Sequence, residues 1–139
     1  MAAKKKIQVT KTDHERLTAM IASMRNVSAE DQACLDKLQG ELDRARIIAS
    51  KRVQPDVVTM NSTVALRDLD NGQLYEYKLV YPQDADPEEN KISILAPVGT
   101  ALLGYSMGDV VEWPVPAGVR HLQIEGIRYQ PEASGDYNL

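Results

Sequence analysis

Residues 30 to 50 read EDQACLDKLQGELDRARIIAS, and small or apolar side chains recur there at alternating intervals of three and four: Leu35, Leu38, Leu42, Ala45 and Ala49. This spacing is typical of a helix that packs lengthwise against another helix. A second apolar stripe lies upstream, in residues 12 to 24, and consists of Leu17, Met20, Ile21 and Met24. Only residues 25 to 28 separate the two segments, so the sequence predicts an antiparallel helical hairpin over residues 12 to 52.

The same segments carry signals for where the helices begin. Thr12 followed by Glu15, and Ser28 followed by Asp31, have the spacing of a capping box, whose side chains bind free backbone N–H groups of the first turn. A first helix of about 13 residues would be roughly 20 Å long. The second helix, at about 22 residues, would be longer by some three turns. We therefore expect its end, around residues 44 to 51, to pack elsewhere or to connect to the next domain.

After Arg52 the chain changes character, because β-branched residues, Gly and Pro replace the helical spacing. Asn71-Gly72 separates two β-prone runs and is a strong signal for a β-hairpin. The predicted strands are 63–67, 74–81, 91–95, 110–113 and 119–129, with a short helix over 97–103. The sequence thus predicts an α+β domain over residues 53 to 139, an antiparallel sheet with one short helix. From Pro131 onward we expect an extended tail.

Charge is distributed unevenly along the chain. Residues 1–11 have four lysines and no acid, residues 12–52 have seven acids and seven bases, and residues 53–139 have thirteen acids and five bases. The first segment reads as a flexible basic arm. An acidic C-terminal domain is repelled by phosphate backbones, so direct nucleic-acid binding is disfavoured and a protein partner is expected. The absence of an apolar run of about 18 residues favours a soluble, cytoplasmic protein without a membrane contact.

The side chains form no recognisable catalytic motif. His14 and His121 lie in unrelated segments, and nucleotide-binding and nucleophile-elbow motifs are absent. We therefore expect no enzyme activity, no cofactor and no bound metal. The remaining candidate site is the hairpin tip, with Asn26, Ser28, Glu30 and Asp31. Its two carboxylates either favour a helix N-terminus through the helix dipole or help to hold a magnesium ion in a partner's active site.

Four segments resemble the Gre family of transcript-elongation factors: VVTMNSTVALRDLDNG, LVYP, ISILAPVGTALLGYSMGDVVEW and YQPEASGDY. The similarity extends over nearly all of residues 54 to 139, while the N-terminal hairpin matches in architecture more than in residues. The resemblance implies an N-terminal antiparallel coiled coil followed by an FKBP-like C-terminal domain of the Gre type. It also implies that this domain binds bacterial RNA polymerase at the rim of the secondary channel.

In Gre factors a loop reading Asp-Ser-Pro, between a strand and a short helix, docks on this rim. The I-S-x-x-x-P frame places the loop at Leu95, Ala96 and Pro97 here, and only the proline is kept. The resemblance thus implies a polymerase-docking loop at these three residues, with Pro97 as the leading candidate. A proline there also suits the first turn of a helix, and the two roles are compatible.

The hairpin departs further from the family. Gre factors use a longer coiled coil to carry two acidic tip residues to the catalytic magnesium, where they support cleavage of backtracked RNA. A hairpin with roughly 20 Å of paired helix would stop short of that metal. We therefore expect a monomeric regulator that occupies the channel entrance and competes with Gre-type factors without stimulating cleavage. Two alternatives remain: a cleavage factor that uses Glu30 and Asp31, and, by fold analogy only, a prolyl isomerase with an apolar pocket around Trp113.

Overall fold

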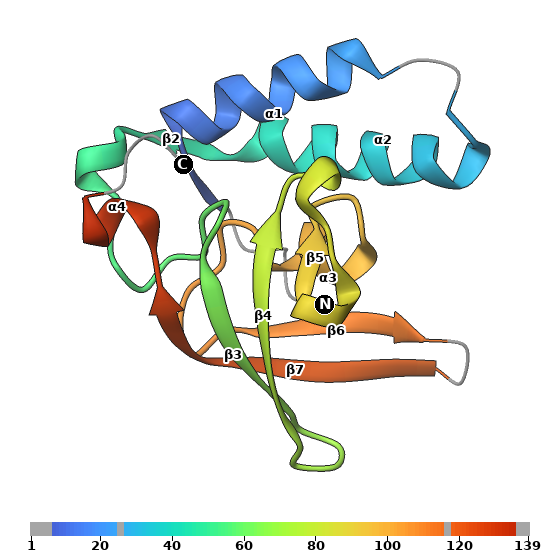
Figure 1. The fold of residues 1–139 in the computed structure, drawn as a ribbon, viewed down its shortest axis with the longest axis vertical. Coiled ribbons are helices and arrows are strands. Elements are labelled where there is room, and N and C mark those ends of the chain that lie inside the picture. Colours follow the sequence, from blue (N-terminus) through green and yellow to red (C-terminus); the bar gives the residue numbers. More distant parts are fainter. Residues whose placement is uncertain (1–6, 25–26, 116–117, 136–139) are drawn as a thin grey trace.

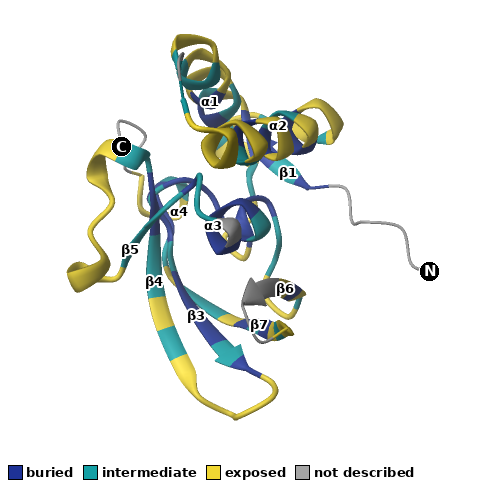
Figure 2. Cartoon of the chain, turned by 90° about the vertical axis from the view of Figure 1, so that its right-hand side faces the viewer, coloured by how far each residue is buried: buried dark blue, intermediate teal, exposed yellow. Residues whose placement is uncertain are grey.

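The computed structural model describes residues 7–24, 27–115 and 118–135, without the side chains of Pro97 and residues 113–115 (Figure 1). Two helices, α1 (Lys11–Ser23) and α2 (Ala29–Arg44), run antiparallel above a curled five-stranded sheet. A short helix, α3 (Pro97–Leu102), lies between the hairpin and the sheet (Figure 2). The predicted α+β architecture, with an N-terminal helical hairpin, is confirmed.

The helical hairpin is held by the apolar seam that the spacing predicts. Its fully buried side chains are Leu17 of α1 and Leu35, Leu38 and Leu42 of α2. α2 is shorter than predicted, however, because it ends at Arg44 and Ala45 takes an extended conformation. The helices have 13 and 16 residues, so they differ in length by less than one turn rather than by three.

The segment that follows α2 pairs with the segment that precedes α1. The strands β1 (Gln8–Thr10) and β2 (Arg46–Ile48) form a two-stranded parallel sheet. Two β-branched isoleucines in succession favour this strand over the helix predicted there. The flexible arm predicted over residues 1 to 11 is corrected in part, because residues 8 to 10 form β1, Lys11 begins α1, and Ile7 and Val9 are buried. Residues 1 to 6 lie outside the described residues.

The two helix starts were not predicted equally well. At α2, Ser28 Oγ accepts a hydrogen bond from the N–H of Asp31 (3.1 Å), as the capping spacing predicts. At α1 the prediction of Thr12 is wrong, since the cap is Thr10, whose Oγ1 accepts from the N–H of Asp13 (3.1 Å). Thr10 ends strand β1, so its backbone (φ −66°, ψ 151°) already has the extended conformation of a cap.

Replacing Ser28 with alanine should lower the free energy of unfolding by about 1 kcal/mol, because the N–H of Asp31 loses its side-chain acceptor. The matched variant Ser28→Asp keeps an acceptor and should remain close to the wild type. Urea unfolding followed by circular dichroism measures both. Equal losses in the two variants would contradict a capping role for Ser28.

The five-stranded sheet has the order β5-β4-β3-β7-β6. Its strands are β3 (Thr63–Asp68), β4 (Leu74–Val80), β5 (Lys91–Ser93), β6 (Val110–Val115) and β7 (Gly118–Tyr129). β3 and β4 form the hairpin predicted around Asn71-Gly72. The turn is closed by a hydrogen bond from the N–H of Gly72 to the carbonyl of Asp68 (2.7 Å), and Gly72 has a φ of +75°. Glycine adopts this left-handed conformation without a steric penalty.

One strand pair differs from the predicted antiparallel arrangement, because β5 runs parallel to β4. Two 3-10 helices, η2 (Pro82–Asp84) and η3 (Pro87–Glu89), carry the chain back along β4 before β5 begins. Asn90, with a φ of +56°, then turns the chain into β5. The segment between the predicted strands 74–81 and 91–95 therefore has structure of its own.

The hairpin and the C-terminal domain share one hydrophobic core. Side chains from β1, from both N-terminal helices, from α3 and from the sheet belong to one cluster of buried residues, which includes Ile7, Leu17, Leu38, Leu66, Leu102 and Leu122. Beyond β7, a helix α4 (Pro131–Ser134) corrects the predicted extended tail, and residues 136 to 139 lie outside the described residues. No helix in the described ranges is both long and apolar enough to cross a membrane.

Candidate functional site

The predicted docking loop, Leu95 to Pro97, connects β5 to α3. Ser93, the last residue of β5, fixes it with two acceptors. Its Oγ accepts a hydrogen bond from the N–H of Leu95 (3.0 Å), and its carbonyl accepts one from the N–H of Ala96 (3.0 Å). Ala96 is the residue that precedes the first turn of α3, and Pro97 stands in that turn, as predicted. The loop is thus a short, hydrogen-bonded turn.

Three further contacts hold this loop from beneath. The hydroxyl of Thr100 donates to the carbonyl of Ile94 (2.6 Å), and the N–H of Ile94 donates to the carbonyl of Val80 in β4 (2.9 Å). Gly99 packs so closely on Ser93 that a Cβ atom at this glycine would lie 2.2 Å from the Ser93 carbonyl oxygen. α3 therefore cannot move away from β5 without breaking the loop.

The side chains of the loop give it an uncharged surface. Leu95 is half-buried and packs against the core, and Ala96 is half-buried. The side chain of Pro97 lies outside the described part of the structure. A partner that docks here would meet apolar and backbone groups, because neither Leu95 nor Ala96 has a polar side chain.

The hairpin tip is separate from the docking loop. Ser28, Glu30 and Asp31 are exposed in and just before the first turn of α2, and the tip extends beyond α3 (Figure 1). Asn26, also predicted at the tip, lies outside the described residues. The 13 residues of α1 give a paired length of roughly 20 Å, as the sequence predicts.

A buried polar junction between the hairpin and the C-terminal domain escaped the sequence analysis. Asp13 of α1 is 3% exposed, and its Oδ2 accepts a hydrogen bond from the N–H of Met60 (3.0 Å). Burial raises the pKa of Asp13 to about 6, opposed by the Met60 hydrogen bond and reinforced by the negative charge of Glu132. The spacing of Asp13 after Thr10 was the available signal, but it indicates only a helix start.

The rest of this junction ties the linker to α4. Thr59 Oγ1 donates a hydrogen bond to Glu132 Oε1 (2.7 Å) and lies 2.9 Å from the hydroxyl of Ser62. The side-chain amide of Gln130 donates to the carbonyls of Gln54 and Val57, both at 2.7 Å. The angle between the hairpin and the C-terminal domain is thus set by buried hydrogen bonds as well as by the apolar core.

Two family models match the chain and together span most of it. The model "Transcription elongation factor, GreA/GreB, C-term" matches residues 53–129, and the model "Rnk N-terminus" matches residues 5–48. The division between the two matches falls in the linker between the hairpin and the sheet.

Individual proteins show the same relation. The chain is 46% identical over 105 residues to the regulator of nucleoside diphosphate kinase of Escherichia coli (strain K12), which covers 75% of this chain and 77% of that protein. It is 40% identical over 100 residues to transcription elongation factor GreA of Alkaliphilus oremlandii, which covers 72% of this chain and 63% of that protein. The solved structure of a prokaryotic transcription elongation factor GreA/GreB from Nitrosomonas europaea matches with a TM-score of 0.75 at 41% identity, over 91% of this chain and 100% of that one.

Proposed function

Because this chain belongs to the GreA/GreB family of transcription elongation factors, we propose that it regulates transcription by binding RNA polymerase at the rim of the secondary channel. The C-terminal domain supplies the contact through the loop Leu95 to Pro97. This loop is supported by its rigid attachment to β5 and α3, which limits the ordering free energy that binding would require. Because bacterial RNA polymerase works in the cytoplasm, a protein that acts on it works there too.

The second part of the proposal, that the protein does not stimulate RNA cleavage, rests on the length of the hairpin. With 13 residues in α1, the hairpin presents about 20 Å of paired helix, less than the coiled coil that the Gre resemblance associates with RNA cleavage. The protein therefore occupies the channel entrance and excludes Gre-type factors, but its tip does not reach the catalytic magnesium. It acts as a regulator rather than as an enzyme, in keeping with the name of its Escherichia coli relative.

The same hairpin supports action as a monomer. The leucine seam of α2 is already covered within one chain, since Leu35, Leu38 and Leu42 are each no more than 2% exposed. A second copy would find no free seam there, so the helices do not drive dimer formation.

An alternative within the same family is a transcript-cleavage factor. Glu30 and Asp31 are exposed in the first turn of α2, where two carboxylates are favourably placed against the helix dipole. If the tip did reach the catalytic magnesium, these two side chains would be the ones to support cleavage. The reach of the hairpin argues against this alternative, and a cleavage assay separates the two.

The test is a competition experiment with a labelled Gre factor bound to RNA polymerase core enzyme that holds a backtracked transcript. We expect the protein to displace the label and to reduce RNA cleavage in the same tubes, in proportion to its concentration over its dissociation constant. Pro97→Ala should displace less label at equal concentration, by about threefold to tenfold, because one side chain of a small contact is lost.

Pro87→Ala is the matched control, since Pro87 also opens a short helix but is exposed at the opposite end of β5. It should compete like the wild type. A rise in RNA cleavage on addition of the protein alone, lost in Glu30→Gln/Asp31→Asn, would favour the cleavage factor. No displacement well above micromolar concentration would contradict binding at the channel entrance.

A further inference from the structure

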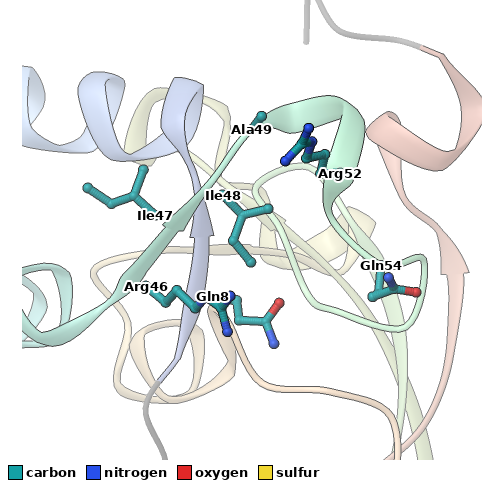
Figure 3. A pocket seen from close by; sticks show the side chains of 7 residues that line it. All are labelled: Gln8, Arg46, Ile47, Ile48, Ala49, Arg52 and Gln54. Carbon is teal, nitrogen blue, oxygen red and sulfur yellow. The ribbon is translucent and has the colours of Figure 1, made fainter.

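A pocket opens at the base of the hairpin, away from the docking loop (Figure 3). Its volume is about 490 Å³, within the usual range of sites for small ligands. Its walls come from β1, from β2 and the residues after it, and from the linker to the sheet: Gln8, Arg46, Ile47, Ile48, Ala49, Arg52 and Gln54. The proposed contact with polymerase uses none of these residues.

Two unpaired positive charges face this pocket. Arg46 lies beside Gln8 at one end, and Arg52 lies on the far side of Ile48 (Figure 3). Within the described ranges, neither guanidinium has a carboxylate within ion-pair distance. The arginines of the sheet differ, because each is paired: Arg67 with Glu125, Arg120 with Asp68 and Arg128 with Glu76.

Arg46 and Arg52 lack counter-charges in the described structure although the chain has a formal net charge of −4. Carboxylates are abundant, yet none neutralises these two side chains in the described structure. The planar guanidinium group matches the oxygens of phosphate by paired hydrogen bonds. Two such groups around one pocket indicate a ligand with more than one anionic oxygen, such as a diphosphate or a longer phosphate chain.

The other walls suit the rest of a nucleotide. Ile48 is half-buried and gives the pocket an apolar surface on which a flat heterocycle can pack, whereas the side chain of Ile47 points to the other face of β2 (Figure 3). The side-chain amides of Gln8 and Gln54 each offer a donor and an acceptor, as the edge of a nucleobase or a ribose requires. Inorganic phosphate alone would use only the charged part of this lining.

The pocket is formed before any ligand arrives. The N–H of Arg46 donates to the carbonyl of Ile7 (2.8 Å), which fixes β2 against β1. The hydroxyls of Thr12 and Ser50 lie 3.2 Å apart, which ties the residues after β2 to α1. The hydrogen bond from Gln130 to the carbonyl of Gln54 holds the linker wall. A preformed site binds with a smaller entropic cost than one that must be assembled.

We propose that this pocket binds a nucleotide, with Arg46 and Arg52 on its phosphates and Ile48 against its base. The site lies where the base of the hairpin meets the linker to the sheet, so a bound nucleotide contacts both. Its occupancy then stabilises the native arrangement of the two by mass action.

Isothermal titration calorimetry of the full-length protein tests the proposal without polymerase, so its outcome is independent of the proposed function. The probes are ADP, ATP, GDP, GTP, inorganic pyrophosphate and adenosine, in magnesium-free buffer at low salt. Nucleoside di- and triphosphates should bind, pyrophosphate should bind more weakly, and adenosine should give no heat. Arg46→Gln and Arg52→Gln should each weaken nucleotide binding by about tenfold or more.

Lys51→Gln is the matched control, because Lys51 carries the same charge next to Arg52 and is exposed but does not line the pocket. Its affinity should stay within about twofold of the wild type. In ¹⁵N spectra, nucleotide should shift the amide signals of Gln8, Ile47 and Gln54. Unchanged thermal unfolding of the arginine variants shows that they fold.

Three results would overturn the proposal. The first is no binding of any nucleotide at millimolar concentration. The second is an equal loss of affinity in Lys51→Gln, which would indicate general attraction to positive charge. The third is an affinity for pyrophosphate equal to that for the nucleotides. The pocket would then bind anions in general, and its apolar wall would contribute nothing to binding.

Discussion

Replacing Gly99 with alanine is expected to lower the free energy of unfolding by about 3 kcal/mol and to abolish competition at the polymerase. A Cβ atom at residue 99 would lie 2.2 Å from the carbonyl oxygen of Ser93 and 3.2 Å from Cδ1 of Leu79. The nearer atom belongs to the backbone of β5, so the clash is relieved only if α3 and β5 move apart. That movement displaces Leu95 and Ala96, which hydrogen-bond to Ser93.

Gly40→Ala is the matched control for this substitution. Gly40 lies inside α2, and a Cβ atom there would meet nothing within 4 Å. Alanine favours helix over glycine, so this variant should be more stable than the wild type by about 0.5–1 kcal/mol. Urea unfolding measures both variants, and the competition assay is repeated on the fraction that is folded. A Gly99→Ala protein as stable as the wild type would contradict the tight packing of α3 on β5.

The second large effect concerns pH and the buried carboxyl of Asp13. Its pKa is raised from the ordinary value of 3.8 to about 6 in the folded protein, chiefly by burial. The folded state therefore holds this proton more tightly than the unfolded state does. The resulting stabilisation is complete below pH 4 and is lost as the pH rises through 6. A rise of this pKa from 3.8 to about 6 corresponds to about 3 kcal/mol of stability lost by pH 7.

Asp13→Asn isolates this contribution. An amide oxygen can still accept the hydrogen bond from Met60, but it does not titrate. The free energy of unfolding of the variant, minus that of the wild type, should rise by about 2.5 kcal/mol between pH 4 and pH 7. Urea unfolding at several pH values gives this difference. A difference that stays constant with pH would show that Asp13 titrates normally in the folded protein.

The wild type must be compared with a variant because other carboxyl groups change the free energy of unfolding with pH in the opposite direction. Burial alone would raise the pKa of Asp68, but hydrogen bonds from the N–H groups of Asp70 and Asn71 and from Arg120 hold this pKa below its ordinary value. Asp68 therefore adds stability that is lost as the pH falls. Asp43→Asn, the same substitution at an exposed position of α2, serves as a control for the change of side chain.

The features that the sequence predicted well are those determined by nearby residues. The seam through Leu35, Leu38 and Leu42 depends on spacing within one helix, and the β3–β4 hairpin depends on Asn71-Gly72 between two β-prone runs. The short helix after Pro97 and the cap at Ser28 also follow from residues within one turn. These local signals agree with the final fold, so they could be read directly.

The features that were missed depend on residues far apart in the chain. β2 forms where Arg46 to Ile48 meet Gln8 to Thr10, and this pairing adds to the local preference of the two isoleucines in ending α2 at Arg44. The choice of Thr10 as cap follows from the same strand. The parallel direction of β5 depends on how residues 81 to 90 fold back along β4. Pattern within a short window carries no information on such contacts.

The candidate site likewise has parts that could be predicted from nearby residues and parts that could not. The position of Leu95 to Pro97 between a strand and a helix could be predicted, because the surrounding residues resemble a known loop. The Asp13–Met60 contact and the pocket at the base of the hairpin could not, because each is assembled from segments on both sides of the hairpin. Arginines at 46 and 52 look like ordinary helix-end residues until α2 is seen to stop at Arg44.

Strand β1 also constrains the order in which the chain can fold during synthesis. It leaves the ribosome before the other described elements, but the N–H of Gln8 is bound to the carbonyl of Gly104, and a Cβ atom at Gly104 would lie 2.5 Å from Cβ of Ile7. The helical hairpin can form from local contacts as soon as α2 has emerged, whereas the strand at its base waits for most of the C-terminal domain. Until then, the buried faces of Ile7 and Val9 remain exposed to the chaperones that receive the nascent chain.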